Sequence, residues 1–391
     1  MERIRTAVIG VGNMGSAHAG CIAGGKIDGL TLSALCDISP DRQAWCRARY
    51  PDIPCFGSVR ELIASGLVDA VVVAVPHPSH SDVAMEALRA GLHALVEKPI
   101  DVTVSKAQVL CDVADRSGKV FAVMLNQRTT PLFRRARAIV QGGELGQLKR
   151  TVWIITNWYR TQHYYDSGSW RATWAGEGGG VLLNQAPHNL DLWQWICGMP
   201  VTVTGFCDVA RHHRIEVEDD ATILTRYENG ATGVFITSTG EYPGTNRLEI
   251  SGDRGKIVLE NGVLRHWRLE TPEREVCFRS EESMARIPFG YEEYTPEEPE
   301  TAHAGILQNW CNAIRQGEPL LSPGRDGLNE LTISNAAYLS QWTGNAPIAL
   351  PMDTDTFDRL LAERAAASTI KKTGAAAEER TQYSQRWQVN W

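Results

Sequence analysis

The sequence has little of what marks several large classes of protein. Its nine cysteines form no C-x-x-C pair, so we expect neither a disulfide framework nor a cysteine-rich zinc site. No apolar run approaches the roughly 18 residues of a membrane span. Residues 1–5 lead into a strand-like run without the apolar region of a signal peptide. The chain also has no excess of positive charge, because 39 lysines and arginines are outnumbered by 46 acidic residues, giving a formal net charge of −7.

Nucleic-acid and anionic-membrane surfaces need clustered positive charge, so we expect neither partner. The chain has 391 residues, which at roughly 100–200 residues per domain suggests two or three domains. It is 43% hydrophobic and 22% charged, the balance of a globular protein with a large core. We therefore expect a cytoplasmic protein, and the composition favours an enzyme.

The first part of the chain, residues 1–125, alternates short apolar runs with helix-like segments. The predicted strands are 6–9, 30–36, 70–75, 94–96 and 120–125. Continuous apolar runs are typical of strands buried on both faces of a parallel sheet. Because repeated strand–helix–strand units form such sheets, we predict a doubly wound α/β domain.

The pattern changes after that domain. Residues 150–278 mostly alternate between apolar and polar and contain turn signals, which predicts hairpins of an antiparallel sheet. One helix is expected at 186–197, and two amphipathic helices near 301–316 and 323–342. The acidic, proline-containing stretch 281–300 reads as an exposed loop.

These patterns divide the chain into three parts. We expect the α/β domain at 1–125, an α+β domain at 126–350 that binds substrate and other subunits, and a C-terminal extension at 351–391. The last residues of that extension, 371–391, look loosely structured.

A glycine-rich string directly follows the first predicted strand and opens a helical segment. Its residues are Gly10, Val11, Gly12, Asn13, Met14 and Gly15. In a G-x-G-x-x-G string, the first glycine turns tightly, the second lets backbone approach a pyrophosphate, and the third allows close helix–strand packing. The alternative is a tight turn without a ligand.

Asp37 ends the second predicted strand, 22 residues after Gly15. A carboxylate at this place can accept hydrogen bonds from the adenosine ribose and repel a 2′-phosphate. That favours NAD over NADP, although the nearby Arg42 points the other way. A solvated surface aspartate is the alternative.

Two further segments end predicted strands, at the sheet edge where ligands bind. The third strand runs into Pro76, His77, Pro78, Ser79 and His80, and the fourth into Glu97, Lys98 and Pro99. Both segments should border the cofactor. Taken alone, the histidines could instead be loop or helix-cap residues, and the lysine an ordinary surface residue.

Taken in order, these signatures resemble those of the Gfo/Idh/MocA family, the relatives of glucose–fructose oxidoreductase and inositol dehydrogenase. The resemblance covers nearly the whole chain. In its second half it rests on Trp170-Arg171 and on Gly178-Gly179-Gly180 followed by His188 and Asp191. The resemblance implies a Rossmann domain followed by a domain with a large, mostly antiparallel open sheet, often used for oligomer contacts. It also implies NAD(P)-dependent oxidation or reduction of a sugar, cyclitol or related carbinol.

The segment 181–193 carries the predicted catalytic residues. On a continuous helix, at about 100° per residue, Asn184, His188 and Asp191 fall within one stripe. They could also lie on a solvated helix face, with Asn184 as the N-cap, because Pro187 suits a first helical turn.

Family members usually carry aspartate where this chain has Asn184, and an amide cannot take a proton. We therefore assign proton transfer to His188, whose unperturbed pKa suits neutral pH. Lys98 would hold the carbinol oxygen and stabilise its developing negative charge. Asp191 would orient the imidazole or bind a substrate hydroxyl.

Aromatic residues are concentrated just before that segment. Six of the twelve tryptophans lie between 153 and 195. Aromatic faces can stack on sugar rings, so we expect a carbohydrate site, although core packing is the alternative. The predicted substrate-binding residues are Arg128, Trp158, Tyr164, Trp170, Asn184 and His188, and Gln127 and Arg171 are expected near the cofactor. No metal site is expected, because the adjacent His212 and His213 would point apart on a strand.

Three functions remain open. The first is an NAD-dependent dehydrogenase of a sugar, sugar derivative or cyclitol. The second is a redox-neutral glycosidase or lyase that uses bound NAD for transient oxidation of a sugar ring. The third is a non-enzymatic NAD-binding regulator, which loss of Lys98 or His188 would have favoured. For the enzyme we expect a homo-oligomer, dimer or tetramer, formed through the open sheet.

Overall fold

The computed structural model describes residues 3–168 and 170–369. They form two compact units that alternate along the chain. The first unit contains residues 3–129, 176–178 and 301–331, and the second contains the remaining described residues. The sequence-based division placed 301–331 in the second domain, whereas the structure packs this stretch into the first unit. The predicted tail, 371–391, lies outside the described residues.

The first unit is built on a six-stranded sheet in which every pair of neighbouring strands is parallel. The strand order is β3-β2-β1-β4-β5-β6, so the order reverses between β1 and β4. The predicted doubly wound α/β domain is confirmed, and ligands of such sheets bind where the strand order reverses. The strands are β1 (Ile4–Ile9), β2 (Leu30–Cys36), β3 (Cys55–Phe56), β4 (Ala70–Val73), β5 (His93–Val96) and β6 (Phe121–Val123).

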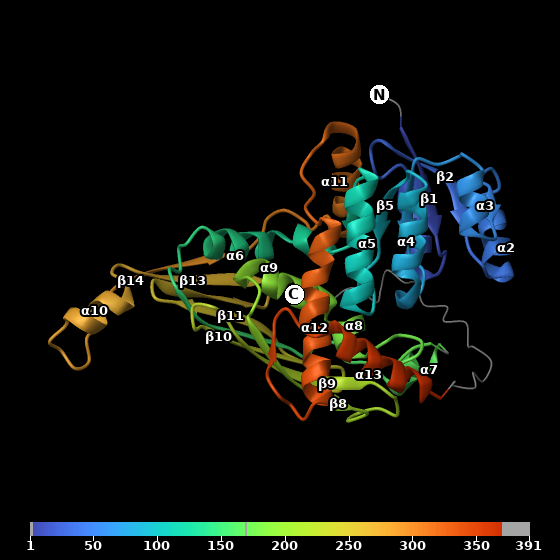
Figure 1. Cartoon of the computed structure of the whole chain (residues 1–391). Helices are drawn as coiled ribbons and strands as arrows, with labels where there is room; N and C mark the ends of the chain where they lie inside the picture. Colours follow the sequence, from blue (N-terminus) through green and yellow to red (C-terminus); the bar gives the residue numbers. More distant parts are fainter. Residues whose placement is uncertain (1–2, 169, 370–391) are drawn as a thin grey trace. The chain divides into compact units, whose positions relative to one another are not determined.

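Crossover helices connect these strands (Figure 1). They are α1 (Asn13–Ala23), α2 (Pro40–Arg49), α3 (Val59–Ala64), α4 (His80–Arg89) and α5 (Val104–Ser117). Three short 3₁₀ helices follow strand or loop ends: η1 (His77–Ser79), η2 (Asn126–Thr129) and η3 (Gly324–Asp326). All four residues of β4 are fully buried, which explains the continuous apolar run.

Helix α11 (Ala302–Gln316) completes the core of the first unit. Its side chains Ile306, Leu307, Trp310 and Cys311 belong to the same buried cluster as β1, β2 and α1 residues. Residues that follow α11 also cover the edge strand, because Val123 N donates to Ser322 O at 3.2 Å. Burial of this apolar helix face explains why 301–331 joins the first unit.

The second unit contains a nine-stranded sheet of order β14-β13-β12-β11-β7-β10-β9-β8-β15. Only the pair β7–β10 is parallel among its described strands. The predicted α+β architecture with a large, mostly antiparallel sheet is confirmed. The strands are β7 (Leu148–Ile155), β8 (Thr202–Val209), β9 (Glu218–Arg226), β10 (Thr232–Ser238), β11 (Asn246–Gly252), β12 (Gly255–Glu260), β13 (Val263–Leu269), β14 (Phe289–Tyr294) and β15 (Ile348–Ala349).

Two helices of the second unit carry predicted catalytic residues: α8 ends at Asn184, and α9 contains His188 and Asp191. The helices of this unit are α6 (Pro131–Gln141), α7 (Gln162–Asp166), α8 (Val181–Asn184), α9 (Pro187–Cys197), α10 (Glu273–Arg279) and α13 (Thr354–Ala366). Helix α12 (Gly327–Trp342) begins in the first unit and continues in the second. No helix among the described residues is long and apolar enough to cross a membrane.

One local prediction is wrong. The stretch 281–300, expected to be a loop, contains β14, which pairs with β13 at the sheet edge. Its side chains are mostly exposed on both faces, including Phe289 and Tyr291. Because an edge strand without a buried face needs no apolar alternation, the sequence carried no strand signal here.

We predict that Trp310→Ala lowers the unfolding free energy of the first unit by about 3–5 kcal/mol. The Trp310 side chain is fully buried, so its removal leaves a cavity in the core. Chemical denaturation measures the loss. Phe278→Ala, at a side chain that is 76% exposed, is the matched control and should change stability by less than about 0.5 kcal/mol. Equal effects of the two substitutions would contradict the packing of 301–331 into this core.

Candidate active site

The glycine loop between β1 and α1 has the shape that a pyrophosphate requires. Gly10 has φ of +83°, and a Cβ there would lie 2.6 Å from Ala74 O. A Cβ on Gly15 would lie 1.8 Å from Gly10 O, whereas one on Gly12 would meet no atom within 4 Å. Strand, loop and helix therefore pack closely while the backbone at Gly12 stays open. No side chain caps α1, so backbone N–H groups at its N-terminus remain available to an anion.

Asp37 and Arg42 flank this loop with opposite charges. The carboxylate of Asp37 accepts hydrogen bonds from Val11 N at 2.7 Å and from Ser39 N at 2.9 Å. Arg42 Nε donates to Val11 O at 2.7 Å, and Nη2 donates to Ser16 Oγ at 2.8 Å. The structure thus brings the predicted ribose ligand to the loop, together with a guanidinium.

His80, predicted to border the cofactor, is buried between the segments that follow β4 and β5. It is 1% exposed, and its ring nitrogens lie 2.7 Å from Pro99 O and 2.8 Å from Val75 O. Both nitrogens therefore contact protein oxygens, and the ring links the segment after β4 to the one after β5. Pro76 is exposed and His77 half-buried, so both remain accessible to a ligand.

Glu97 and Lys98 follow β5, and Glu97 interacts with the buried His18 and the half-buried His303. His18 Nε2 of α1 lies 2.7 Å from Glu97 Oε1, and both side chains are nearly inaccessible. Burial works against the charged form, but the hydrogen bond from His18, with nearby positive charge, lowers the pKa of Glu97 to about 2. Burial lowers the pKa of His303 to about 4. Lys98, which is half-buried, therefore follows a carboxylate that is charged at neutral pH.

The 3₁₀ helix after β6 carries the predicted site residues Gln127 and Arg128, together with Asn126. Arg128 is fully buried, and its Nη1 donates to Leu321 O and to Asp326 Oδ2, at 3.1 and 2.6 Å. Its guanidinium is thus engaged by the protein, away from the predicted role in substrate binding. Asn126 Oδ1 and Gln127 Oε1 are buried without a hydrogen-bond partner. Such orphaned oxygens fit a ligand that donates N–H or O–H groups.

In the second unit, the predicted catalytic segment is not one helix. Helix α8 ends at Asn184 and α9 begins at Pro187, so a single helical stripe does not relate Asn184 to His188. Proline at the first position of α9 explains the new start. Asn184 is half-buried, whereas His188 and Asp191 are 5% and 1% exposed. Asp191 Oδ1 accepts from Gln194 Nε2 at 3.0 Å.

The predicted aromatic site residues divide into two groups. Trp158 is 2% exposed and donates from Nε1 to Asn189 Oδ1 at 3.3 Å, so it packs in the core of this unit. The guanidinium of Arg171 lies over the rings of Trp170 and Tyr164, at 4.5 and 4.8 Å, and donates to the Tyr164 hydroxyl at 3.0 Å. These three side chains form one half-buried cluster.

Gln185 and Asn189 belong to the same region, and no sequence pattern indicated a role for either. Gln185 Nε2 donates to the Tyr164 hydroxyl at 3.2 Å, and Gln185 Oε1 is buried without a partner. Asn189 is fully buried with an unpartnered Nδ2. Both residues are near His188 in the sequence. Their unpartnered buried atoms could not be predicted, because burial depends on the tertiary fold.

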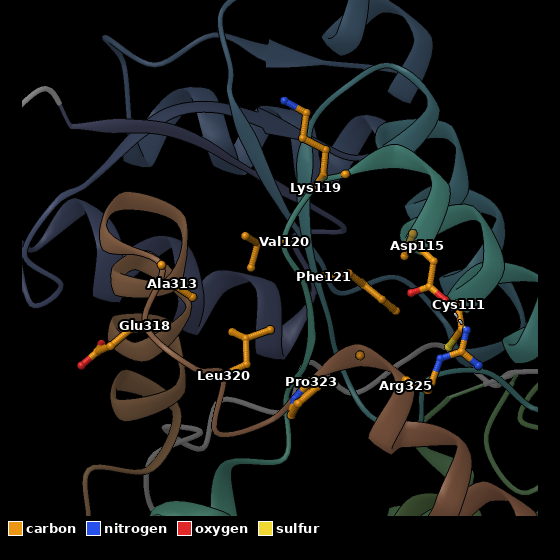
Figure 2. A pocket seen from close by; sticks show the side chains of 14 residues that line it. Cys111, Asp115, Lys119, Val120, Phe121, Ala313, Glu318, Leu320, Pro323 and Arg325 are labelled. Atoms are coloured by element: carbon orange, nitrogen blue, oxygen red, sulfur yellow. Dashed lines mark hydrogen bonds and ion pairs between the residues drawn. The ribbon is translucent and has the colours of Figure 1, made fainter.

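A cavity of about 440 Å³ lies elsewhere in the first unit, lined by residues of α5, β6, α11, η3 and the neighbouring loops, including Lys119 and Arg325 (Figure 2). Arg325 contacts Asp112 and Asp115 of α5. None of the glycine-loop or strand-end residues lines this cavity, so it is separate from the candidate active site.

Comparisons with known proteins match both units. Residues 4–125 match the family model described as an oxidoreductase family with an NAD-binding Rossmann fold, and residues 133–258 match the GFO/IDH/MocA C-terminal domain. A myo-inositol 2-dehydrogenase of Thermotoga maritima is 24% identical over 343 residues, which cover 86% of this chain and 96% of that protein. An uncharacterized oxidoreductase of Schizosaccharomyces pombe is 30% identical over 222 residues, 55% of this chain and 59% of that protein.

Among solved structures, the WlbA dehydrogenase from Bordetella pertussis, in complex with NADH and UDP-GlcNAcA, has a TM-score of 0.75 and 27% identity. The alignment covers 90% of this chain and 100% of that protein.

The Glu97 contact predicts how stability depends on pH. The pKa of Glu97 is lower in the folded state than the ordinary 4.5, so its contribution is present above about pH 4.5 and is lost as pH falls towards 2. Wild type should therefore exceed Glu97→Gln in unfolding free energy by on the order of 2–3 kcal/mol at neutral pH. Urea unfolding from pH 3 to 7 measures the difference. A difference that does not change with pH would contradict the low pKa.

Proposed function

Because the chain belongs to the Gfo/Idh/MocA family of oxidoreductases, we propose that it is an NAD-dependent dehydrogenase of a sugar, sugar derivative or cyclitol. The reaction moves a hydride between a carbinol carbon and the nicotinamide ring. The observation that carries the proposal is the close-packed glycine loop, open at Gly12, in the same unit as Glu97 and Lys98. A myo-inositol dehydrogenase and a nucleotide-sugar complex among the relatives support the substrate class.

NAD is the proposed cofactor, in preference to NADP. The residues fit it on two counts: the cradle around Gly12, and the orphaned buried oxygens of Asn126 and Gln127 beyond β6. Asp37 accepts from the adenosine ribose hydroxyls, and its charge repels a 2′-phosphate. Arg42 is already hydrogen-bonded to the loop and lies 4.5 Å from the Trp45 ring. When bound, NAD supplies the hydride acceptor of the oxidation.

The chain's own residues handle the proton and the charge. His188 takes the hydroxyl proton during oxidation and returns it during reduction, because Asn184 has no group that can take it. Lys98 donates to the carbinol oxygen and stabilises the negative charge that develops there. Asn184 binds substrate through its amide, and Asp191 holds a substrate hydroxyl or the imidazole. Tyr164 and Trp170 contact the sugar, and Arg171, packed against both rings, lies near the cofactor.

The enzyme is proposed to work as a homo-oligomer, a dimer or tetramer formed through the open sheet. Phe206 on β8 and Leu224 on β9 remain 43% and 42% exposed. Both lie on the sheet face that alternates with the buried side chains, where a second copy would cover them.

A substrate screen tests the function. Free sugars, cyclitols including myo-inositol, and glycosides are each incubated with NAD, while NADH is followed by absorbance and products are analysed in parallel. Stoichiometric NADH with one compound is the expected result. Product formation without net NADH would instead identify the redox-neutral reaction, and no turnover with NAD bound would favour a regulator.

His188→Ala should lower kcat by at least about 100-fold with the substrate from that screen, because general acid–base catalysis contributes roughly that much or more. NAD affinity, measured by titration calorimetry, should stay within about twofold because the loop that binds NAD is intact. His163→Ala, at an exposed histidine of the same unit, is the control and should retain activity. Unchanged turnover of His188→Ala would remove this histidine from catalysis.

Asp37→Ala should reduce the preference for NAD over NADP by about tenfold or more, because it removes one hydrogen-bonded, repulsive carboxylate, which is worth at least about 1.4 kcal/mol. The ratio of kcat/KM with the two cofactors measures it. Asp41→Ala, at an exposed acid on α2, serves as the control for general loss of negative charge. If the ratio of kcat/KM with NAD to that with NADP stays unchanged, Asp37 does not bind the adenosine ribose.

A further inference from the structure

Two adjacent carboxylates at the start of β9, Glu218 and Asp219, have no exposed surface. Buried carboxylates are costly unless they are hydrogen-bonded, and each of these accepts backbone N–H groups from a different segment. We propose that both are positioning residues of the dehydrogenase. Glu218 fixes segment 180–188, which carries Asn184 and His188, and Asp219 fixes segment 160–165, which carries Tyr164. The proposal rests on the function proposed above.

Glu218 binds the beginning of the catalytic segment. Its carboxylate accepts from Gly180 N and from Leu182 N, each at 2.9 Å, and from the Tyr338 hydroxyl at 2.6 Å. Gly180 and Leu182 lie at the start of α8, where backbone N–H groups lack partners within the helix. One carboxylate thus satisfies two of these groups and is itself held by α12 through Tyr338.

The segment also has no room to shift. A Cβ on Gly180 would lie 1.9 Å from Glu218 O, and a Cβ on Gly179 would lie 2.4 Å from the Tyr338 hydroxyl. The two glycines therefore lie directly against β9 and α12. A movement of the Glu218 side chain would therefore break its hydrogen bonds to Gly180 N and Leu182 N or displace this backbone.

Backbone hydrogen bonds carry the position of Gly180 onward to α9. Asn184 N donates to Gly180 O at 2.9 Å, and Ala186 N donates to Val181 O at 2.8 Å. Leu190 N then donates to Ala186 O at 2.9 Å. Because the first residue of this chain of contacts is held by Glu218, the orientation of Asn184 and His188 depends on that carboxylate.

Asp219 organises a turn on the other segment. Its Oδ1 accepts from Arg211 N at 3.0 Å, and its Oδ2 accepts from His212 N and His213 N at 2.9 and 2.8 Å. Asp219 Oδ2 also lies 2.8 Å from His213 Nδ1. Four contacts to three successive residues fix the turn 211–213.

The turn 211–213 and the adjacent Arg214 hold segment 160–165. His213 Nε2 lies 2.9 Å from Arg160 O, and the His213 ring centroid lies 4.8 Å from that of Tyr165. Arg214 N donates to Gln162 Oε1 at 2.9 Å. The Tyr164 hydroxyl on this segment accepts from Gln185 Nε2, so the segments held by Glu218 and Asp219 meet at one hydrogen bond.

The two carboxylates should affect different kinetic constants. Glu218→Gln replaces one acceptor oxygen by an NH₂ group that cannot accept from Gly180 or Leu182. We expect kcat to fall about tenfold with KM within about threefold, because the catalytic groups lose their alignment. Asp219→Asn should instead raise KM about tenfold with kcat within about threefold, because it loosens the substrate-facing segment.

Hydrogen–deuterium exchange supplies a readout that does not need substrate. Glu218→Gln should speed amide exchange in peptides of 180–190, and Asp219→Asn in peptides of 160–165 and 211–214. Glu249→Gln, an acid on β11 that makes surface ion pairs with Arg247 and Lys256, is the matched control and should change neither exchange nor kinetics.

Two further variants keep the test decisive. Tyr338→Phe removes the hydroxyl that donates to Glu218 but leaves the carboxylate in place. It should speed amide exchange in peptides of 180–190, which tests the proposal even if Glu218→Gln does not fold. His188→Ala is measured in parallel with the sugar that gives NADH. If His188→Ala keeps full turnover, the proposed function fails. If it loses turnover while Glu218→Gln or Tyr338→Phe behaves like Glu249→Gln, the positioning role is overturned.

Discussion

The buried contact between His18 and Glu97 joins the parts of the first unit on which the proposed chemistry depends. His18 belongs to α1, whose N-terminus directly follows the glycine loop, and Glu97 immediately precedes Lys98. Leaving either partner alone in the core would be strongly unfavourable, so the contact restrains helix and strand end together. His80 adds a second link, because it bridges the ends of β4 and β5. These two sets of contacts thus fix the glycine loop and Lys98 relative to each other within the first unit.

Much of the first unit could be predicted because its signals are local. A parallel sheet with helices on its faces requires continuous apolar strands, and the glycine loop requires glycine wherever a Cβ would collide with Ala74 or with Gly10. Asp37 was predictable in the same way, because it directly follows the apolar run of β2, which lies beside β1 in the sheet. The structure brings each of these residues to the expected edge of the sheet.

The remaining features depend on contacts between distant parts of the sequence. Arg128 reads as a polar site residue but is neutralised by Asp326, almost 200 positions away. The packing of α11 against β1 and α1 has the same character, as does the anchoring of Gly180 by Glu218. The helix break before Pro187 was visible in the sequence, yet a single helical stripe described the segment equally well. No local periodicity encodes such pairings, because each is decided by what the tertiary fold brings close.

We propose that this chain moves a hydride from a carbinol carbon to NAD and that the product leaves oxidised. The most direct measurement follows deuterium from that carbon in a labelled substrate by mass spectrometry. Hydride transfer to NAD should place one deuterium in the nicotinamide ring of the NADH formed and leave none at that carbon in the product. Deuterium retained in a redox-neutral product, with unlabelled NAD recovered, would contradict it.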